Sequence, residues 1–177
     1  FKKRYVAAAA CALAMVGTAS AVEVSRDGTG DLLIAPGYFI GGGMTTDLKV
    51  INTSQTDSVV AKVVFRHPVT SAEVLDFLIY LSPSDVWNGT VSCEVADAAG
   101  TCTRSVVTSA DDSIQLENST AFASAATPAH IISDNATAAA TGRGALPNQG
   151  YVEVLMGSAY AVAPNRPGVL KSNILAA

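Results

Sequence analysis

The stretch Val59-Val-Ala-Lys-Val-Val-Phe-Arg66, followed after a short polar break by Val74-Leu-Asp-Phe-Leu-Ile-Tyr-Leu81, decides the fold. Successive side chains of an extended chain point to opposite sides, so every second residue from Val59 to Phe65 lies on one side, and that side is wholly apolar. The second run alternates in a similar way. Two such strands are expected to form a hairpin whose shared apolar side is covered by another sheet.

A helix is the alternative for residues 71–80, because the apolar residues of this segment also fit helical spacing. β-Branched and aromatic residues dominate the second half of the run, and Pro83 stops it soon afterwards, which favours a strand. A further strand is expected over residues 85–91. Its Trp87 is expected in the core, because a lone tryptophan beside apolar strands is usually buried.

The remaining sequence predicts further short strands and one long segment with few large apolar residues. Residues 31–40 are expected to form a bent strand or a strand pair, in which Pro36 and Gly37 force a turn or an edge position. Other strands are expected at residues 46–52, 103–108, 113–117 and 150–156. Residues 118–148, rich in Ala, Ser, Thr, Gly and Pro, predict a long loop or disordered excursion with a short helix near residues 128–133. We therefore predict an all-β fold, an immunoglobulin-like or jelly-roll β-sandwich.

Residues 1–21 have the order of a secretory signal peptide. A basic start precedes an apolar block from Ala7 to Val16, and cleavage is expected after Ala21, at the small residues Ala19-Ser-Ala21. An apolar run of about ten residues is too short to cross roughly 30 Å of hydrocarbon, so no transmembrane anchor and no stable membrane span after cleavage are expected. Cys11 suggests a lipoprotein, but it stands too close to the basic cluster for a normal leader.

One mature domain is expected over residues 22–177, a length sufficient for a single core. The chain begins without Met and ends at Ala177 without a tail or an anchor. We interpret it as a fragment of a longer reading frame, or as a chain from which the initiator is omitted.

The charge balance excludes nucleic acid as the expected partner. Removal of residues 1–21 takes three of the eleven basic residues and none of the fifteen acidic ones, leaving eight against fifteen and a net charge of −7. The remaining Lys and Arg are spread singly along the chain, whereas a phosphate-binding surface needs them clustered.

Cys93 and Cys102 are expected to form a disulfide. They flank the turn-like sequence Asp97-Ala-Ala-Gly100, as cysteines across a hairpin do in an exported chain. A metal site would need further soft ligands nearby, and the sequence has none there. We predict a structural disulfide, no metal and no cofactor.

No catalytic residue is predicted, and the chain is not expected to be an enzyme. The two histidines, His67 and His130, stand apart from any recognisable nucleophile, and no Gly-x-Ser-x-Gly elbow occurs. Asp27 and Asp31 bracket Gly-Thr-Gly but lack the number of ligands that a calcium loop needs.

Several segments together resemble a group of uncharacterised bacterial secreted or cell-surface proteins. The resemblance lies at residues 30–39, 50–54, 60–66 and 74–87, and more loosely at residues 150–155. It implies a longer chain with a β-rich N-terminal region, placed in the periplasm or at the cell surface. It implies no catalytic residues.

Two functions are expected from these observations. The first is an exported structural or adhesive protein that acts by protein–protein contact, with itself or with envelope components. Residues 22–34, with Leu32 and Ile34, are expected to add as a strand to a neighbour's open sheet edge. The alternative is a carbohydrate-binding sandwich in which Tyr38, Tyr80 and Trp87 stack on sugar rings.

Overall fold

The computed structural model describes residues 30–117, 119, 121–136 and 144–161, and the predicted signal peptide lies outside this part. The described residues from Asp31 to Ala161 belong to one compact unit. Its elements are β1 (Leu32–Phe39), a short 3₁₀ turn η2 (Gly41–Gly43), β2 (Thr45–Ile51), β3 (Asp57–Arg66), β4 (Glu73–Leu81), β5 (Val86–Ala96), β6 (Cys102–Ser109), β7 (Ala129–Asp134) and β8 (Gln149–Ala161).

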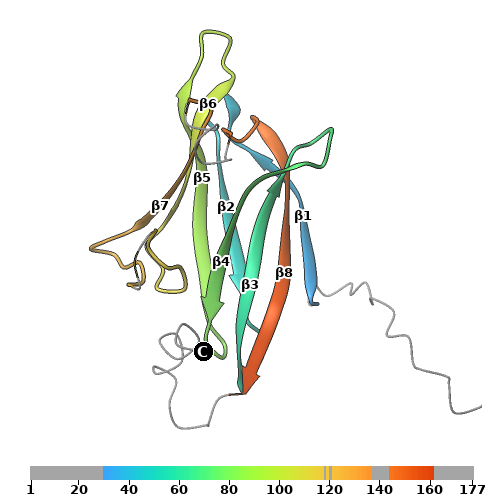
Figure 1. The fold of residues 1–177 in the computed structure, drawn as a ribbon, viewed down its shortest axis with the longest axis vertical. Coiled ribbons are helices and arrows are strands. Elements are labelled where there is room, and N and C mark those ends of the chain that lie inside the picture. The colour runs from blue at the N-terminus through green and yellow to red at the C-terminus, as the bar shows by residue number, and fades with distance from the viewer. Residues whose placement is uncertain (1–29, 118, 120, 137–143, 162–177) are drawn as a thin grey trace, which may run out of the picture. The chain divides into compact units, whose positions relative to one another are not determined.

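The strands form two antiparallel four-stranded sheets that pack into a sandwich (Figure 1). The first sheet has the order β1-β8-β3-β4, and the second has the order β2-β5-β6-β7. The hairpin predicted from the opening stretch is β3–β4, with Val63 opposite Phe77. Residues 73–81 form a strand, as predicted, and not a helix. The all-β sandwich is therefore confirmed.

The core lies between the sheets and contains the residues that the alternation assigns to it. Val63 and Phe65 of β3 are fully buried, and Trp87 of β5 is 0% exposed, as predicted. The indole fits because Gly89 follows two residues later on the same side of the strand. A Cβ there would lie 2.4 Å from Cζ2 of the indole, so only glycine leaves room for the ring.

Two predictions for the second half of the chain are wrong. The expected short helix near residues 128–133 is the strand β7, whose Ala129 and Ile131 are buried. Residues 113–117 form no full strand and make only isolated bridges, Ile79 with Ile114 and Gln115 with Phe122. β7 is a strand because it pairs with β6, and its residues are alternately buried and exposed. The small and polar residues around it give no local sign of this pairing.

The side chain of Asn52 holds one end of the sandwich together. It is only 6% exposed, although it lies in a turn. Its amide nitrogen donates hydrogen bonds to the carbonyl oxygens of Asp57 at 2.7 Å and Ser82 at 2.8 Å, and its oxygen accepts one from the backbone of Ser54. The amide thus joins the end of β2, the start of β3 and the turn between β4 and β5.

Candidate interaction surface

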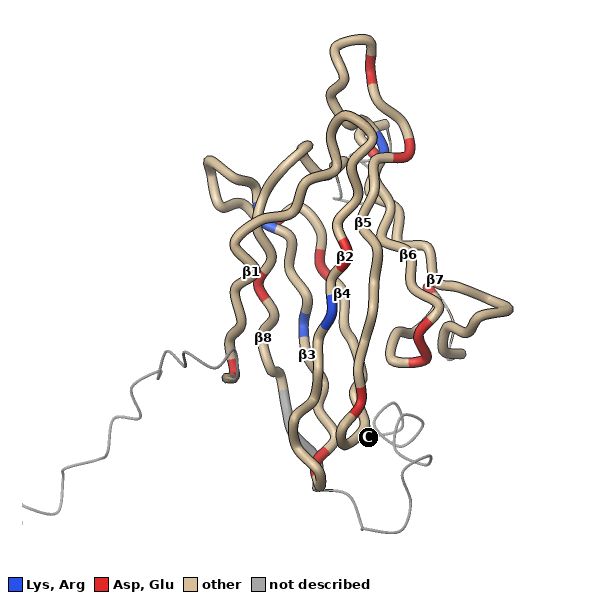
Figure 2. Tube along the Cα trace, turned by 180° about the vertical axis from the view of Figure 1, so that it is seen from behind, with Lys and Arg blue, Asp and Glu red and all other residues tan. Residues whose placement is uncertain are grey.

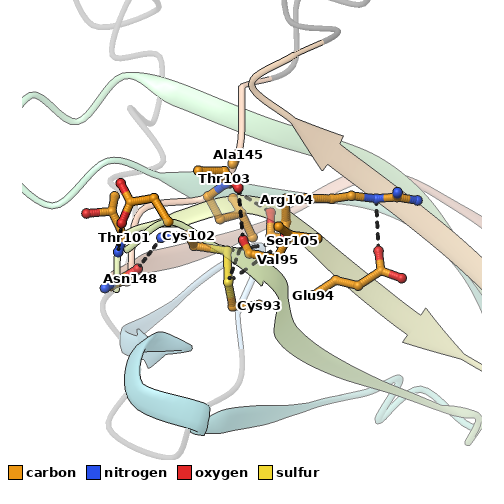
Figure 3. Close-up of a disulfide and its surroundings, with 12 residues drawn as sticks. Cys93, Glu94, Val95, Thr101, Cys102, Thr103, Arg104, Ser105, Ala145 and Asn148 are labelled. Carbon is orange, nitrogen blue, oxygen red and sulfur yellow. Dashed lines mark hydrogen bonds and ion pairs between the residues drawn. A yellow bond between two sulfur atoms is a disulfide. The ribbon is translucent and has the colours of Figure 1, made fainter. Parts of the chain in front are cut away.

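The disulfide lies at the end of the β5–β6 hairpin, where it was predicted. Cys93 and Cys102 are bonded, with their Cα atoms 5.7 Å apart (Figure 3). The side chain of Asn148 fastens the neighbouring turn, since it accepts a hydrogen bond from the backbone of Cys102 at 2.9 Å and donates one to the carbonyl of Gly100 at 2.8 Å. The bridge is a structural clamp on the hairpin.

The three predicted stacking residues do not meet on a surface. Tyr38 and Trp87 are 0% exposed, and Tyr80 is 7% exposed. The Tyr38 hydroxyl and the indole nitrogen have no hydrogen-bond partner in the described part of the chain, and burial raises the pKa of Tyr38. Buried rings offer no face to a sugar, so these residues form no stacking platform in this structure.

A hollow of about 590 Å³ lies on the flank where β4 and β7 are the edge strands. Tyr80 contributes to its wall, and the Tyr80 ring meets Phe122 edge to face with centroids 5.7 Å apart. The wall is mixed in character, with His130, Gln115 and Glu117 beside apolar side chains. Nothing in this arrangement selects a ligand.

A group of charged side chains covers the middle of the first sheet's outer face. The basic residues of β3 are Lys62 and Arg66, and Figure 2 shows a basic position in the middle of this strand. Lys62 lies 3.0 Å from Asp76 and 3.4 Å from Glu73, and Arg66 lies 2.9 Å from Glu153. The hydrogen bond to Asp76 raises the pKa of Lys62.

This charged group also surrounds a buried residue of β3. The side of the strand that carries Lys62 and Arg66 includes Val64, which is only 1% exposed. Asp76 and Glu153 are its neighbours on the adjoining strands, and Lys62 and Arg66 flank it along its own strand. Long charged side chains cover apolar surface with their stems, so a valine buried on an outer face is consistent with its surroundings.

The same face changes character towards β1. Leu32 and Ile34 of β1 are 43% and 59% exposed, and Leu155 of β8, directly opposite Leu32, is 36% exposed. We call these three residues the apolar strip. Leu32 and Ile34 lie on the outer side of β1, because Leu33 and Ala35, which alternate with them along the strand, point to the core side.

Among the described residues, no strand pairs with the outer edge of β1 at Leu32 and Ile34. The carbonyl of Asp31 accepts a hydrogen bond from the backbone of Met156 in β8 at 2.8 Å. In an antiparallel pair the peptide groups alternate in direction, so those of Leu33 also face β8, whereas those of Leu32 and Ile34 face away from it. At the far end, the Thr46 hydroxyl bonds both the N–H and the carbonyl of Phe39, at 2.8 and 2.9 Å.

The four edge strands of the sandwich differ in charge. β1 has the sequence LLIAPGYF, with no charged residue. Each of the other three carries at least one: Asp47 and Lys49 in β2, Glu73 and Asp76 in β4, and Asp134 in β7. Charge on an edge strand discourages pairing with another chain, and β1 has only Pro36 and the bulge between Ala35 and Tyr38 for this purpose.

Leu32 and Ile34 were predicted to lie in a segment that adds as a strand to a neighbour's sheet, and the structure also pairs them within their own domain. They pair with Leu155 and Glu153 of β8 in their own sheet. The earlier part of that segment, residues 22–29, lies outside the described residues. Leu155 was not predicted, and only its register opposite Leu32 brings it to this surface.

The described part of the chain contains neither a metal-binding cluster nor a membrane-spanning helix. No three His, Cys, Asp or Glu side chains converge there so as to hold a metal ion. No helix there is long and apolar enough to cross a membrane.

Comparison with known protein families, with curated proteins and with solved structures finds no match to this chain. The surface of β1 therefore has to be interpreted from its own chemistry.

Proposed function

We propose that the chain is an exported protein of the bacterial periplasm or cell surface with a structural or adhesive role, acting by protein–protein contact through the edge of β1. The observation that carries this proposal is the open, uncharged edge beside the apolar strip. Addition of a strand to such an edge needs only backbone hydrogen bonds and apolar side chains at alternate positions. Both requirements are met at Leu32 and Ile34.

The contact is made by an edge of the folded domain. Leu32 and Ile34 already belong to a sheet, so the energetic cost of ordering this strand is met when the domain folds. A strand held in place presents its unpaired peptide groups in a fixed row, so a partner can bind and leave without this strand having to fold or unfold. The basic start and apolar block of residues 1–21 support export.

The immunoglobulin-like class is the finer fold that we propose. In that class the second strand lies beside the fifth, and the third lies beside both its hairpin partner and a late strand. The pairs β2–β5, β3–β4 and β3–β8 correspond to these neighbours. The consecutive hairpins that join β5, β6 and β7 differ from that class.

The test compares two isoleucines on two edge strands. Ile34 in β1 is 59% exposed and Ile51 in β2 is 53% exposed, so lysine at either position leaves the core unchanged. The chain is produced with its own leader in a bacterial host and crosslinked in intact cells with formaldehyde. The exported wild type is expected in species heavier than the single mature chain of residues 22–177, and Ile34→Lys is expected to reduce them severalfold.

Ile51→Lys is expected to behave as the wild type, because β2 already carries charge. A wild type that stays a single chain after crosslinking would overturn the proposed function. An equal loss in both variants would show that the contact does not lie at β1, and would overturn it as well.

A further inference from the structure

Within the described part of the chain, the backbone groups of the β1 edge that have no partner are few and lie at one end of the strand. Pro36 has no N–H, and both backbone groups of Phe39 are bonded to Thr46. Outside the bulge, this leaves the N–H and carbonyl groups of Leu32 and Ile34 facing away from β8. A partner strand can therefore pair over residues 31–35 and no further.

A second copy of β1 can form hydrogen bonds with the N–H and carbonyl groups of Leu32 and Ile34 in one antiparallel register. If Leu33 lies opposite Leu33 of a second copy, Leu32 lies opposite Ile34 of that copy, and Ile34 opposite its Leu32. Each of these two pairs exchanges an N–H and a carbonyl in both directions, because their peptide groups face the open edge. All the free groups of both copies are then used, and neither proline is placed within the paired segment.

The side chains are also self-complementary in this register. On the outer face, Leu32 of each copy packs against Ile34 of the other, and Leu155 extends the contact on both sides. Apolar pairs directly opposite each other in antiparallel strands are favourable. The only charged residue of the segment, Asp31, lies opposite Ala35 of the second copy, so no like charges meet.

The chemistry of the edge favours a second copy over a different protein. A partner recognised by charge would need charged groups on β1, and this strand has none. A contact of about five residues buries less than the roughly 1,200–2,000 Å² of stable complexes, so the pair is weak and depends on concentration. Such a pair forms where many copies are held close together, as at a cell envelope.

We propose that the chain pairs with a second copy of itself, β1 against β1, in the register that sets Leu33 opposite Leu33 and joins two four-stranded sheets into one of eight strands. The second copy is the partner of the β1 contact proposed above, so this inference rests on the proposed function.

Single cysteines test the register. In a non-hydrogen-bonded antiparallel pair the opposite Cα atoms are about 4.5 Å apart, within the roughly 4.4–6.8 Å that disulfides span. Leu33→Cys, in the purified full chain carrying Cys11→Ser, is expected to form a disulfide-linked dimer in mild oxidant. Ile34→Cys is the matched control, because its equivalent in the second copy lies diagonally, at roughly 7–8 Å.

A dimer with Leu33→Cys and at least tenfold less with Ile34→Cys supports the proposal. No dimer with Leu33→Cys, or an equal yield from both variants, overturns it. Circular dichroism of each variant confirms that the fold is intact. If residues 22–29 of the same chain, or a different protein, cover the edge of β1, Leu33→Cys will also stay a single chain. That result likewise overturns pairing with a second copy.

Sedimentation of the wild type gives a second readout that needs no cysteine. We expect a monomer–dimer equilibrium whose dissociation constant Ile34→Lys raises about tenfold or more, while Ile51→Lys leaves it unchanged. A wild type that stays monomeric up to about millimolar concentration overturns self-pairing. If crosslinking in cells still yields heavier species that contain other proteins, the proposed function stands and only the second copy is excluded.

Discussion

β1 and β2 are edge strands of different sheets on the same flank of the sandwich, and they differ mainly in charge. They have eight and seven residues, and the Thr46 hydroxyl connects them. β2 carries Asp47, which accepts a hydrogen bond from Thr90 at 2.7 Å, and Lys49. β1 carries only apolar residues, Gly and Tyr. Length and exposure are alike, so charge is the property to which we attribute the proposed pairing of β1.

The largest expected effect tests how firmly β1 is held. Tyr38 anchors the strand, since it is fully buried and its ring meets Phe65 with centroids 5.4 Å apart. Tyr38→Ala is expected to lower the free energy of unfolding by about 3–5 kcal/mol, as for other large buried aromatics. Urea unfolding measures it, with Phe39→Ala as the control, because Phe39 is 50% exposed. Equal effects of the two substitutions would contradict the anchoring role.

Removal of the disulfide is expected to lower stability without changing association. Cys93→Ser with Cys102→Ser opens a loop of about ten residues, which costs about 2–3 kcal/mol of unfolding free energy. The bridge lies in β5 and β6 and not in β1, so the proposed β1–β1 dimer is expected to persist in the variant. Thermal unfolding and sedimentation measure the two properties separately. Loss of association at temperatures where the chain stays folded would contradict this separation.

High pH is expected to weaken the anchor of β1. Burial raises the pKa of Tyr38 above 10.0, whereas in the unfolded chain the hydroxyl ionises near that value. Above about pH 10 the unfolded state therefore binds fewer protons, and the free energy of unfolding falls by about 1.4 kcal/mol per pH unit. Below pH 10 this contribution is fully present.

Tyr38→Phe is the matched variant for this pH dependence. The hydroxyl has no hydrogen-bond partner in the described part of the chain, so its removal is expected to be neutral or slightly stabilising at pH 7. The variant should lose most of the alkaline slope, with a smaller part left because burial also raises the pKa of Tyr80. An unchanged slope in urea titrations at pH 10 to 11 would exclude Tyr38 as its source.

Thr46→Val removes the hydroxyl that connects the two edge strands. It leaves both backbone groups of Phe39 without this partner, and we expect a loss of about 1 kcal/mol in the free energy of unfolding. Hydrogen exchange at the Phe39 amide should become faster. Thr45→Val, one residue earlier on the same exposed strand, is the control, and an equal change there would argue against the connection.

The last substitution is expected to change stability least, and it tests most directly whether charge distinguishes the edge strands β1 and β2. Asp47→Ser with Lys49→Ser makes β2 as free of charge as β1 while keeping its apolar residues. We expect little change in stability and a new tendency to self-associate, seen by light scattering as a function of concentration. A double variant that stays as soluble as the wild type would show that charge alone does not distinguish the two edges.

The sequence predicts the β3–β4 and β5–β6 hairpins because their signals are local. The alternation from Val59 to Phe65 depends only on neighbouring residues, and so does the turn between Cys93 and Cys102. β7 is missed because His130-Ile-Ile is short and set among Ala, Ser and Thr, and only β6 makes it a strand. For the interaction surface, Leu32 and Ile34 could be selected from sequence. Their pairing with β8 could not, because it joins residues about 120 apart in the chain.

The buried amide of Asn52 has a consequence for modification of the chain. Asn52-Thr-Ser54 has the form of an acceptor for an N-linked glycan, which would be attached at the amide nitrogen. That nitrogen donates to Asp57 and Ser82, so a sugar there would displace the bonds that close this end of the sandwich. The acceptor triplet Asn88-Gly-Thr90 has an exposed asparagine side chain and meets no such conflict. A glycan at Asn52 is therefore incompatible with the closed end of the folded sandwich, whereas a glycan at Asn88 is compatible with it.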